Sequence, residues 1–118
     1  MAMMAVAFPI VPGKTEAWRE FAATINGSRR DDFVASRERV GVRERTFFQS
    51  TPMGDLVIVT IEGDDPMASF GQLLSNTDDE FSQWFLAHAA ELHGFDLSQM
   101  PAGPPSELVI DNQAVVTA

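Results

Sequence analysis

The sequence predicts an α+β fold with the element order β-α-β-β-α-β, in which a four-stranded antiparallel sheet carries two helices on one face. Three observations support this prediction. Short apolar runs alternate with longer stretches of helical periodicity, and a hairpin signal joins the second and third apolar runs. The length of 118 residues suits a single domain that spans residues 1–118.

The N-terminal part of the chain predicts one strand followed by one long helix. Residues 3–11 form an apolar run, and we expect the strand to stop near Phe8 because Pro9 donates no ladder hydrogen bond. Residues 14–40 carry a helical apolar face made of Trp18, Ala22, Ile25, Phe33 and Val40. Residues 26–28 interrupt this stretch, but the apolar phase continues beyond them, so we predict one kinked helix.

The central part predicts a hairpin that is apolar on both faces. Residues 42–51 and 55–62 form its strands, and Thr51-Pro52-Met53-Gly54 makes the turn. The second strand does not alternate, since Leu56 and Ile58 point to one face and Val57, Val59 and Ile61 to the other. The helices can cover only one face, and each large apolar residue left in water forgoes about 1.5–3 kcal/mol of burial. We therefore predict a homodimer packed sheet to sheet.

The C-terminal part predicts a second helix and a last strand. Asp65-Pro66 combines an N-cap with a proline in the first turn, the capping-box pattern at residues 77–80 restarts the helix, and Gly94 ends it. Residues 107–111 are interpreted as the fourth strand, and residues 113–118 match no element. This order completes a ferredoxin-like arrangement.

The charge balance argues against nucleic acids and anionic membranes as partners. The chain has 17 acidic and 8 basic residues, for a net charge of −9. All the basic residues lie between Lys14 and Arg45, where acids interleave with them, so we expect no large net basic face. No apolar run is long enough to span a membrane and no targeting segment is evident, which makes the cytoplasm the expected location.

The residue types exclude several kinds of site. The absence of cysteine rules out disulfides, thiolate zinc sites, iron–sulfur clusters and cysteine nucleophiles. The chain contains no glycine-rich phosphate loop, no GxSxG and no HExxH. His88 and His93 fall on different sides of a helix and make no metal pair, so we expect neither a metal nor a cofactor. His93, beside the stop glycine, is expected to cap the helix, where its cationic form is favoured.

Segments spread over nearly the whole chain resemble those of one structural superfamily. The segment FSQWFLAH (81–88), the element order and the doubly apolar hairpin are similar to the dimeric α/β-barrel superfamily, which includes antibiotic-biosynthesis monooxygenase-like and haem-degrading proteins. Four further segments resemble a small bacterial family of that fold with no assigned function. They are PGKTEAWREF (12–21), GDLVIVTIEGDDP (54–66), ELHGFDLS (91–98) and GPPSELV (103–109). The resemblance implies a dimeric α/β barrel with a pocket between helices and sheet in each subunit, and it implies no particular reaction.

Arg29, Asp32 and Ser36 place polar side chains on the apolar stripe of the first helix. In one interpretation they form a self-satisfied cluster, because Arg29 and Asp32 are three residues apart and can pair. In the other, Arg29 anchors a carboxylate or phenolate between helix and sheet, with Asp32 and Ser36 beside the ligand. Burying an arginine without a partner is costly, which favours the first interpretation.

His88 lies in the middle of the aromatic stripe of the second helix, between Phe81, Trp84 and Leu92. A histidine there is either a hydrogen-bonded core residue or a general base or axial ligand at one end of an aromatic pocket. Haem-degrading members of the superfamily use a histidine on the corresponding helix, and this resemblance is one of position. Phe81 and Phe48 are the expected pocket walls together with Trp84, for which packing in the core is the alternative.

The functional prediction is a small-molecule-binding protein. It includes cofactor-independent oxidation or isomerisation of an aromatic or polyketide-like substrate, with His88 as the base and Arg29 as the anion anchor. Two alternatives stay open: a non-catalytic dimeric binding or regulatory module whose polar stripe is structural, and a haem-binding protein. An open cavity between helices and sheet favours ligand binding, whereas a filled interior favours the module.

Overall fold

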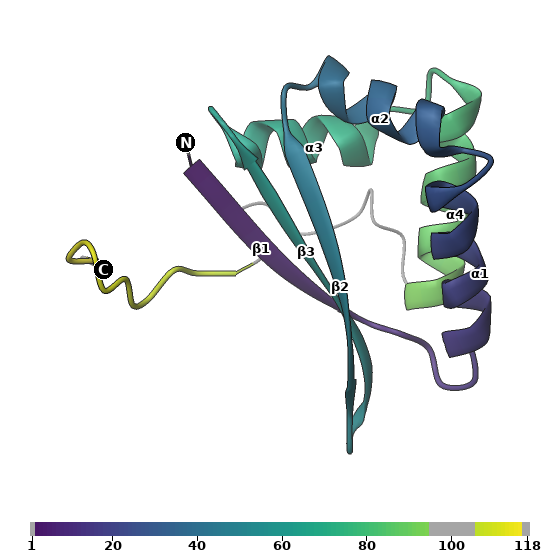
Figure 1. The fold of residues 1–118 in the computed structure, drawn as a ribbon, viewed down its shortest axis with the longest axis horizontal. Helices are drawn as coiled ribbons and strands as arrows, with labels where there is room; N and C mark the ends of the chain where they lie inside the picture. Colours follow the sequence, from purple (N-terminus) through teal and green to yellow (C-terminus); the bar gives the residue numbers. More distant parts are fainter. Residues whose placement is uncertain (1, 95–105, 117–118) are drawn as a thin grey trace.

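A three-stranded antiparallel sheet with four helices on one of its faces forms the described part of the chain (Figure 1). The computed structural model describes residues 2–94 and 106–116. The elements are β1 Ala2–Pro9, α1 Thr15–Asn26, α2 Arg30–Arg39, β2 Arg43–Thr51, β3 Gly54–Gly63, α3 Pro66–Ser75 and α4 Glu80–His93. The strand order is β1-β3-β2, so β3, the third of these strands in sequence, occupies the centre of the sheet. No helix within the described ranges is long and apolar enough to cross a membrane.

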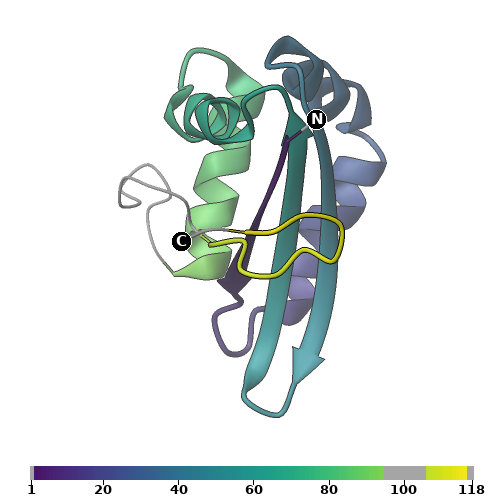
Figure 2. The same ribbon diagram turned by 90° about the vertical axis from the view of Figure 1, so that its left-hand side faces the viewer.

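The predicted fourth strand does not form, and the ferredoxin-like fold built on four strands is wrong, as is the barrel built from two such sheets. Residues 107–110 pair with no strand, and beyond them Asp111 makes only an isolated bridge to Ala114. A strand needs a neighbouring edge for its backbone groups. Residues 106–116 instead leave the sheet after Ser106, whose hydroxyl donates to the Ala5 carbonyl, and extend away from the helices (Figures 1 and 2).

The prediction of one helix over residues 14–40 is also wrong, because α1 and α2 are separate helices. α1 ends at Asn26, and the backbone of Gly27 (φ −114°, ψ −103°) lies outside the helical region. No side chain caps the start of α2, where Arg29 is the N-cap residue. The apolar phase was therefore not a reliable sign of continuity, since α2 packs at a new angle after the glycine (Figure 1).

The second helical stretch likewise contains two helices, α3 and α4, and the start of α3 and the end of α4 follow the sequence signals. Asp65 accepts a hydrogen bond from the backbone N–H of Ala68 at 3.1 Å, and proline occupies the first turn of α3, as predicted. α4 begins at Glu80 and is capped by Asp79, which accepts from the Ser82 N–H at 3.0 Å, so the helix starts two residues later than the predicted capping box at residues 77–80 implies. Gly94 ends α4 in the left-handed conformation (φ 79°), which confirms the predicted stop.

The two faces of the sheet have different surroundings. The register aligns Ala7, Ile58 and Phe47 across the three strands, and the next row is Phe8, Val57 and Phe48. The second row faces the helices, where Phe8 and Val57 are buried. The first row belongs to the opposite, outer face, on which Phe47 is 52% exposed. The predicted division of β3 into two apolar faces is therefore confirmed.

Burial concentrates on the side of the sheet that carries the helices. One cluster joins β1 and β3 to α3 and α4 through Met4, Val6, Phe8, Ile61, Phe70 and Ala89. A second joins β3 to α1 and α4 through Ile10, Trp18, Phe21, Val57 and Leu92. The two clusters hold α1, α3 and α4 on the sheet.

Replacing Ile61 by alanine is expected to lower the free energy of unfolding by about 2–5 kcal/mol, because the side chain is 1% exposed and its loss leaves a cavity. Met53→Ala, at the 99%-exposed tip of the hairpin, is the control and is expected to change stability by less than about 0.5 kcal/mol. Urea denaturation measures both, and equal effects would contradict the assigned core.

Candidate functional site

A cavity of about 490 Å³ lies between the inner face of the sheet and the helices. Aromatic rings from six elements form much of its lining: Phe8, Trp18, Phe21, Phe33, Phe48, Phe70 and Phe85. The charged and titratable side chains of the lining are Arg19, Arg30, Arg37, Glu44 and His93. An aromatic cavity with a few polar groups is the usual form of a small-molecule site.

Arg37 and Glu44 form a buried ion pair in the cavity lining. The Arg37 Nε lies 2.8 Å from a carboxylate oxygen of Glu44, and the side chains are only 10% and 6% exposed. The guanidinium also donates to the Ser36 hydroxyl and stands 4.6 Å from the ring centre of Phe33 and 4.7 Å from that of Phe85. Buried charges need such compensation. The pair joins α2 to β2 and brings a cation under the helices.

His93 is held in one tautomer at the end of α4. Its Nδ1 lies 2.9 Å from the Pro9 carbonyl, and because a carbonyl only accepts, Nδ1 carries the proton. Burial lowers the pKa of His93 below its ordinary value, opposed in part by the hydrogen bond to Pro9. The expected cationic cap is therefore wrong, since the neutral form is favoured. Nε2 keeps its lone pair and has no hydrogen-bond partner among the residues that the structure describes.

The cavity lining is positively charged although the chain is acidic. Three arginines face one glutamate in the lining, whereas the whole chain has a net charge of −9. Arg19 and Arg30 form no ion pair with the described residues, and Arg19 stands 4.3 Å from the ring centre of Phe48. An anion in the cavity would meet donors that the protein has not already paired.

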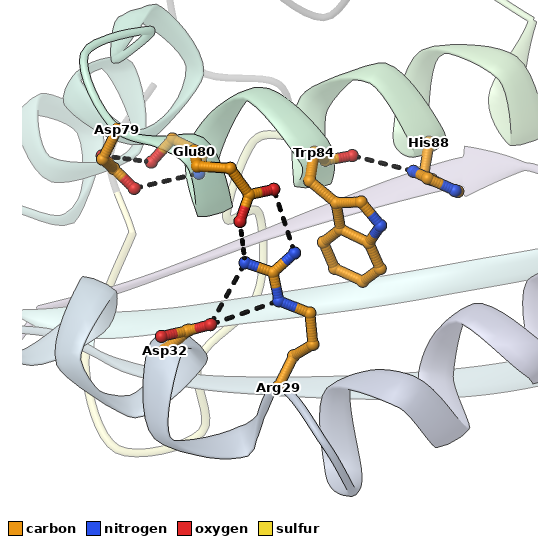
Figure 3. Close-up of polar contacts among 7 residues, drawn as sticks. Arg29, Asp32, Asp79, Glu80, Trp84 and His88 are labelled. Carbon is orange, nitrogen blue, oxygen red and sulfur yellow. Dashed lines mark hydrogen bonds and ion pairs between the residues drawn. The ribbon is translucent and has the colours of Figure 1, made fainter.

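Arg29 lies outside the cavity lining and is fully engaged with carboxylates (Figure 3). Its guanidinium lies 3.1 Å from Asp32 and 2.6 Å from Glu80, and it makes two hydrogen bonds to each carboxylate. The bond from Arg29 lowers the pKa of Glu80. The same guanidinium stands 4.7 Å from the ring centre of Trp84. The pair with Asp32 is the one that the self-satisfied interpretation predicts, whereas the bonds to Glu80 were not predicted and join the start of α2 to α4.

His88 is exposed and also lies outside the cavity lining. Its Nδ1 is 2.9 Å from the Trp84 carbonyl within the same helix (Figure 3). The imidazole stacks on Phe21 with ring centres 5.6 Å apart, and Trp84 packs between His88 and the buried ring of Phe81. The structure thus brings Arg29, Phe81, Trp84 and His88 together as an aromatic and ionic row between α1 and α4, and not as walls of the cavity.

The other predicted site residues are divided between the cavity and its surroundings. Phe48 lines the cavity and stacks on Trp18, with ring centres 5.6 Å apart. Ser36 is buried behind the lining, where its hydroxyl accepts from Arg37. Asp32 is exposed and bound to Arg29.

The sequence reasoning selected none of the charged or titratable lining residues as site residues, although helical spacing points to two of them, Arg37 and His93. Arg37 follows Phe33 by four residues and shares its face of α2. On α4 the side toward the cavity is Phe85, Ala89 and His93, again at intervals of four, whereas the predicted stripe was centred on His88.

Comparisons with models of known families, with curated protein sequences and with solved structures produced no match. Within residues 2–94 and 106–116, no group of three histidine or carboxylate side chains is placed to hold a metal ion. The geometry of the cavity is therefore the basis for assigning a function.

Acidification is expected to destabilise the protein through His93. The pKa of His93 is lower in the folded than in the unfolded chain, so the unfolded chain takes up its proton first as the pH falls. The free energy of unfolding therefore decreases as the pH drops below the pKa of the unfolded histidine, about 6.5. We expect the melting temperature to fall between about pH 7.5 and pH 5.5, above the range in which carboxylates take up protons.

His93→Phe keeps a ring against Phe8 but removes the titrating group, so the fall over this pH interval is expected to shrink. His88→Phe is the control, because it removes an exposed imidazole of the same helix, and the fall in melting temperature over this pH interval is expected to remain. Thermal melts at several pH values measure the effect, and a pH dependence unchanged by His93→Phe would contradict the assignment.

Proposed function

We propose that the protein binds a small aromatic or polyketide-like anion in the cavity between sheet and helices. The observation that carries this proposal is an aromatic lining with three arginines in a chain of net charge −9. A volume of about 490 Å³ lies in the range of small-molecule sites. The open space favours a ligand-binding protein over a module with a filled interior. A cytoplasmic location remains part of the proposal, since a chain without cysteine needs no oxidising compartment.

Turnover of the bound molecule, by oxidation or isomerisation without a cofactor, extends this proposal. Arg29, the anchor first predicted, lies outside the cavity lining, and its donors bind Asp32 and Glu80. Arg19 and Arg30 line the cavity and form no ion pair with the described residues. Arg37 also lines it and pairs with Glu44 through Nε, which leaves Nη2 for a ligand. His88 as the base would require a ligand on the outside of α4, whereas His93 meets a ligand inside the cavity. The proposed anion therefore binds to Arg37, Arg19 and Arg30 among the cavity aromatics.

The fluorescent sulfonate 8-anilinonaphthalene-1-sulfonate tests the binding proposal against its uncharged analogue N-phenyl-1-naphthylamine. The sulfonate is expected to bind more tightly, because it adds an anion to the same rings. Arg30→Gln is expected to lower the affinity for the sulfonate by about threefold, since Arg30 is an exposed cation of the lining without an ion pair among the described residues. The affinity for the uncharged analogue is expected to stay the same. Fluorescence titration measures both affinities.

Arg43→Gln is the matched control, because it removes the same charge from an exposed position on the outer face of the sheet. It is expected to leave both affinities unchanged. Equal binding of the charged and neutral probes, or an equal loss in the two arginine variants, would contradict an anion site in the cavity.

We also propose that a second copy of the chain covers the outer face of the sheet. That face exposes Met3 (60%) and Phe47 (52%), and beside it the C-terminal arm, residues 106–116, exposes Leu108 (65%) and Ile110 (83%). The arm extends away from its own sheet (Figures 1 and 2). Two apolar surfaces that do not cover each other within one chain can cover each other between two chains.

Charge supports the same partner. The outer face carries Arg43, Arg45 and Glu62, and is locally basic, whereas the arm carries Glu107 and Asp111 and no basic residue. The arm of one copy therefore complements the outer face of the other in both polarity and charge. A two-fold arrangement satisfies both copies equally.

Phe47→Glu is expected to convert a dimer into a monomer in sedimentation velocity at micromolar concentration, because it buries a charge in the proposed contact. Met53→Glu places the same charge at the hairpin tip, which lies away from the arm, and is expected to remain dimeric (Figure 1). An unsubstituted protein that sediments as a monomer would refute the proposal.

A further inference from the structure

We infer that the cavity takes an elongated aromatic acid with a hydroxyl group at its far end, the acid bound at Arg37 and the hydroxyl donating to Nε2 of His93. The inference rests on the proposed function and specifies its ligand. It follows from two buried side chains of opposite hydrogen-bonding character in the lining of one cavity.

The Arg37 end offers a donor. Arg37 is 8% exposed; its Nε donates to Glu44 and its Nη1 to Ser36, which leaves Nη2 without a hydrogen-bond partner among the described residues. Because Arg37 lines the cavity, Nη2 is a donor that a ligand in the cavity can meet. A carboxylate is the ligand group that a guanidinium binds most strongly.

The His93 end offers an acceptor. The ring is 8% exposed, and the Pro9 carbonyl takes the only proton of its neutral form, so Nε2 can accept but cannot donate. A carboxylate at this position would place a lone pair against a lone pair. A hydroxyl group supplies the proton that Nε2 lacks.

The register of the sheet separates the two ends. Glu44, the ion-pair partner of Arg37, lies in the row of Ile61 and Met4. Phe48 lies in the row of Val57 and Phe8, and the Phe8 ring packs against His93. The two rows are four residues apart along β2, or about 13 Å at the strand rise. One ligand that meets both ends is therefore longer than a single benzene ring.

The aromatic side chains between the two ends fit flat rings. Phe33 and Phe85 flank Arg37, and Phe48 with its stacked Trp18 lies near the His93 row. All of these side chains line the same cavity. A two-ring hydroxy acid thus matches the lining in length, shape and polarity.

Three naphthalene derivatives test the inference by isothermal titration calorimetry. We expect 6-hydroxy-2-naphthoate to bind about fivefold more tightly than 2-naphthoate, which lacks the hydroxyl. We expect it to bind at least about tenfold more tightly than 2-naphthol, which lacks the acid. His93→Phe is expected to abolish the hydroxyl preference alone, and His88→Phe to preserve it.

The outcomes separate the inference from the proposed function. Equal binding of the hydroxylated and plain acids would overturn the inference while leaving an anion site in place. Failure of both acids to bind would overturn both. Should His93→Phe not fold, long-range ¹H–¹⁵N spectra of the native protein decide the point. Nε2 should be the unprotonated nitrogen and should shift on addition of the hydroxy acid but not of 2-naphthoate, and a protonated Nε2 would refute the inference.

Discussion

The buried ion pair between Arg37 and Glu44 is the constraint on which the site depends. Both charges lie out of water, so each requires the other, and removing one would leave a buried charge uncompensated at a cost of about 3–5 kcal/mol. The pair therefore holds α2 over β2. Because α2 begins after the break at Gly27, it can turn toward the sheet and carry Arg37 with it. The position of α2 is what places a cation among aromatic rings.

The two faces of the sheet have complementary roles. The inner face supports the cavity, whose aromatic lining and excess of arginines over carboxylates suit a ligand that is flat and anionic. The outer face is apolar around Phe47, none of the four described helices covers it, and the arm beyond Ser106 lies on that side. Ligand binding and association of two chains would thus use opposite sides of the same three strands, with β3 contributing to each through alternate residues.

Local signals in the sequence were sufficient for features that neighbouring residues decide. The turn between β2 and β3, the Asp65 cap and the Gly94 stop each depend on a few adjacent residues, and each occurs where the sequence indicates. The predicted fourth strand was wrong for a different reason. A strand must pair with the edge of another strand, and the apolar side chains of residues 107–111 do not indicate whether such an edge is available to them. Helix continuity failed for a related reason, since an apolar phase can persist across a break when both helices pack on one sheet.

The sequence by itself determined the apolar character of both faces of β3, the start of α3, the end of α4, the acidic charge and the exclusion of cysteine chemistry, because these depend on residue type and short spacing. Only the tertiary structure decided that Arg29 is occupied by Glu80, a carboxylate 51 residues away. Only the tertiary structure brought Arg37 and His93 to one cavity and fixed the tautomer of His93 through Pro9, 84 residues away. Hydrogen-bond partners set what a side chain can still bind, and packing between distant segments sets the partners.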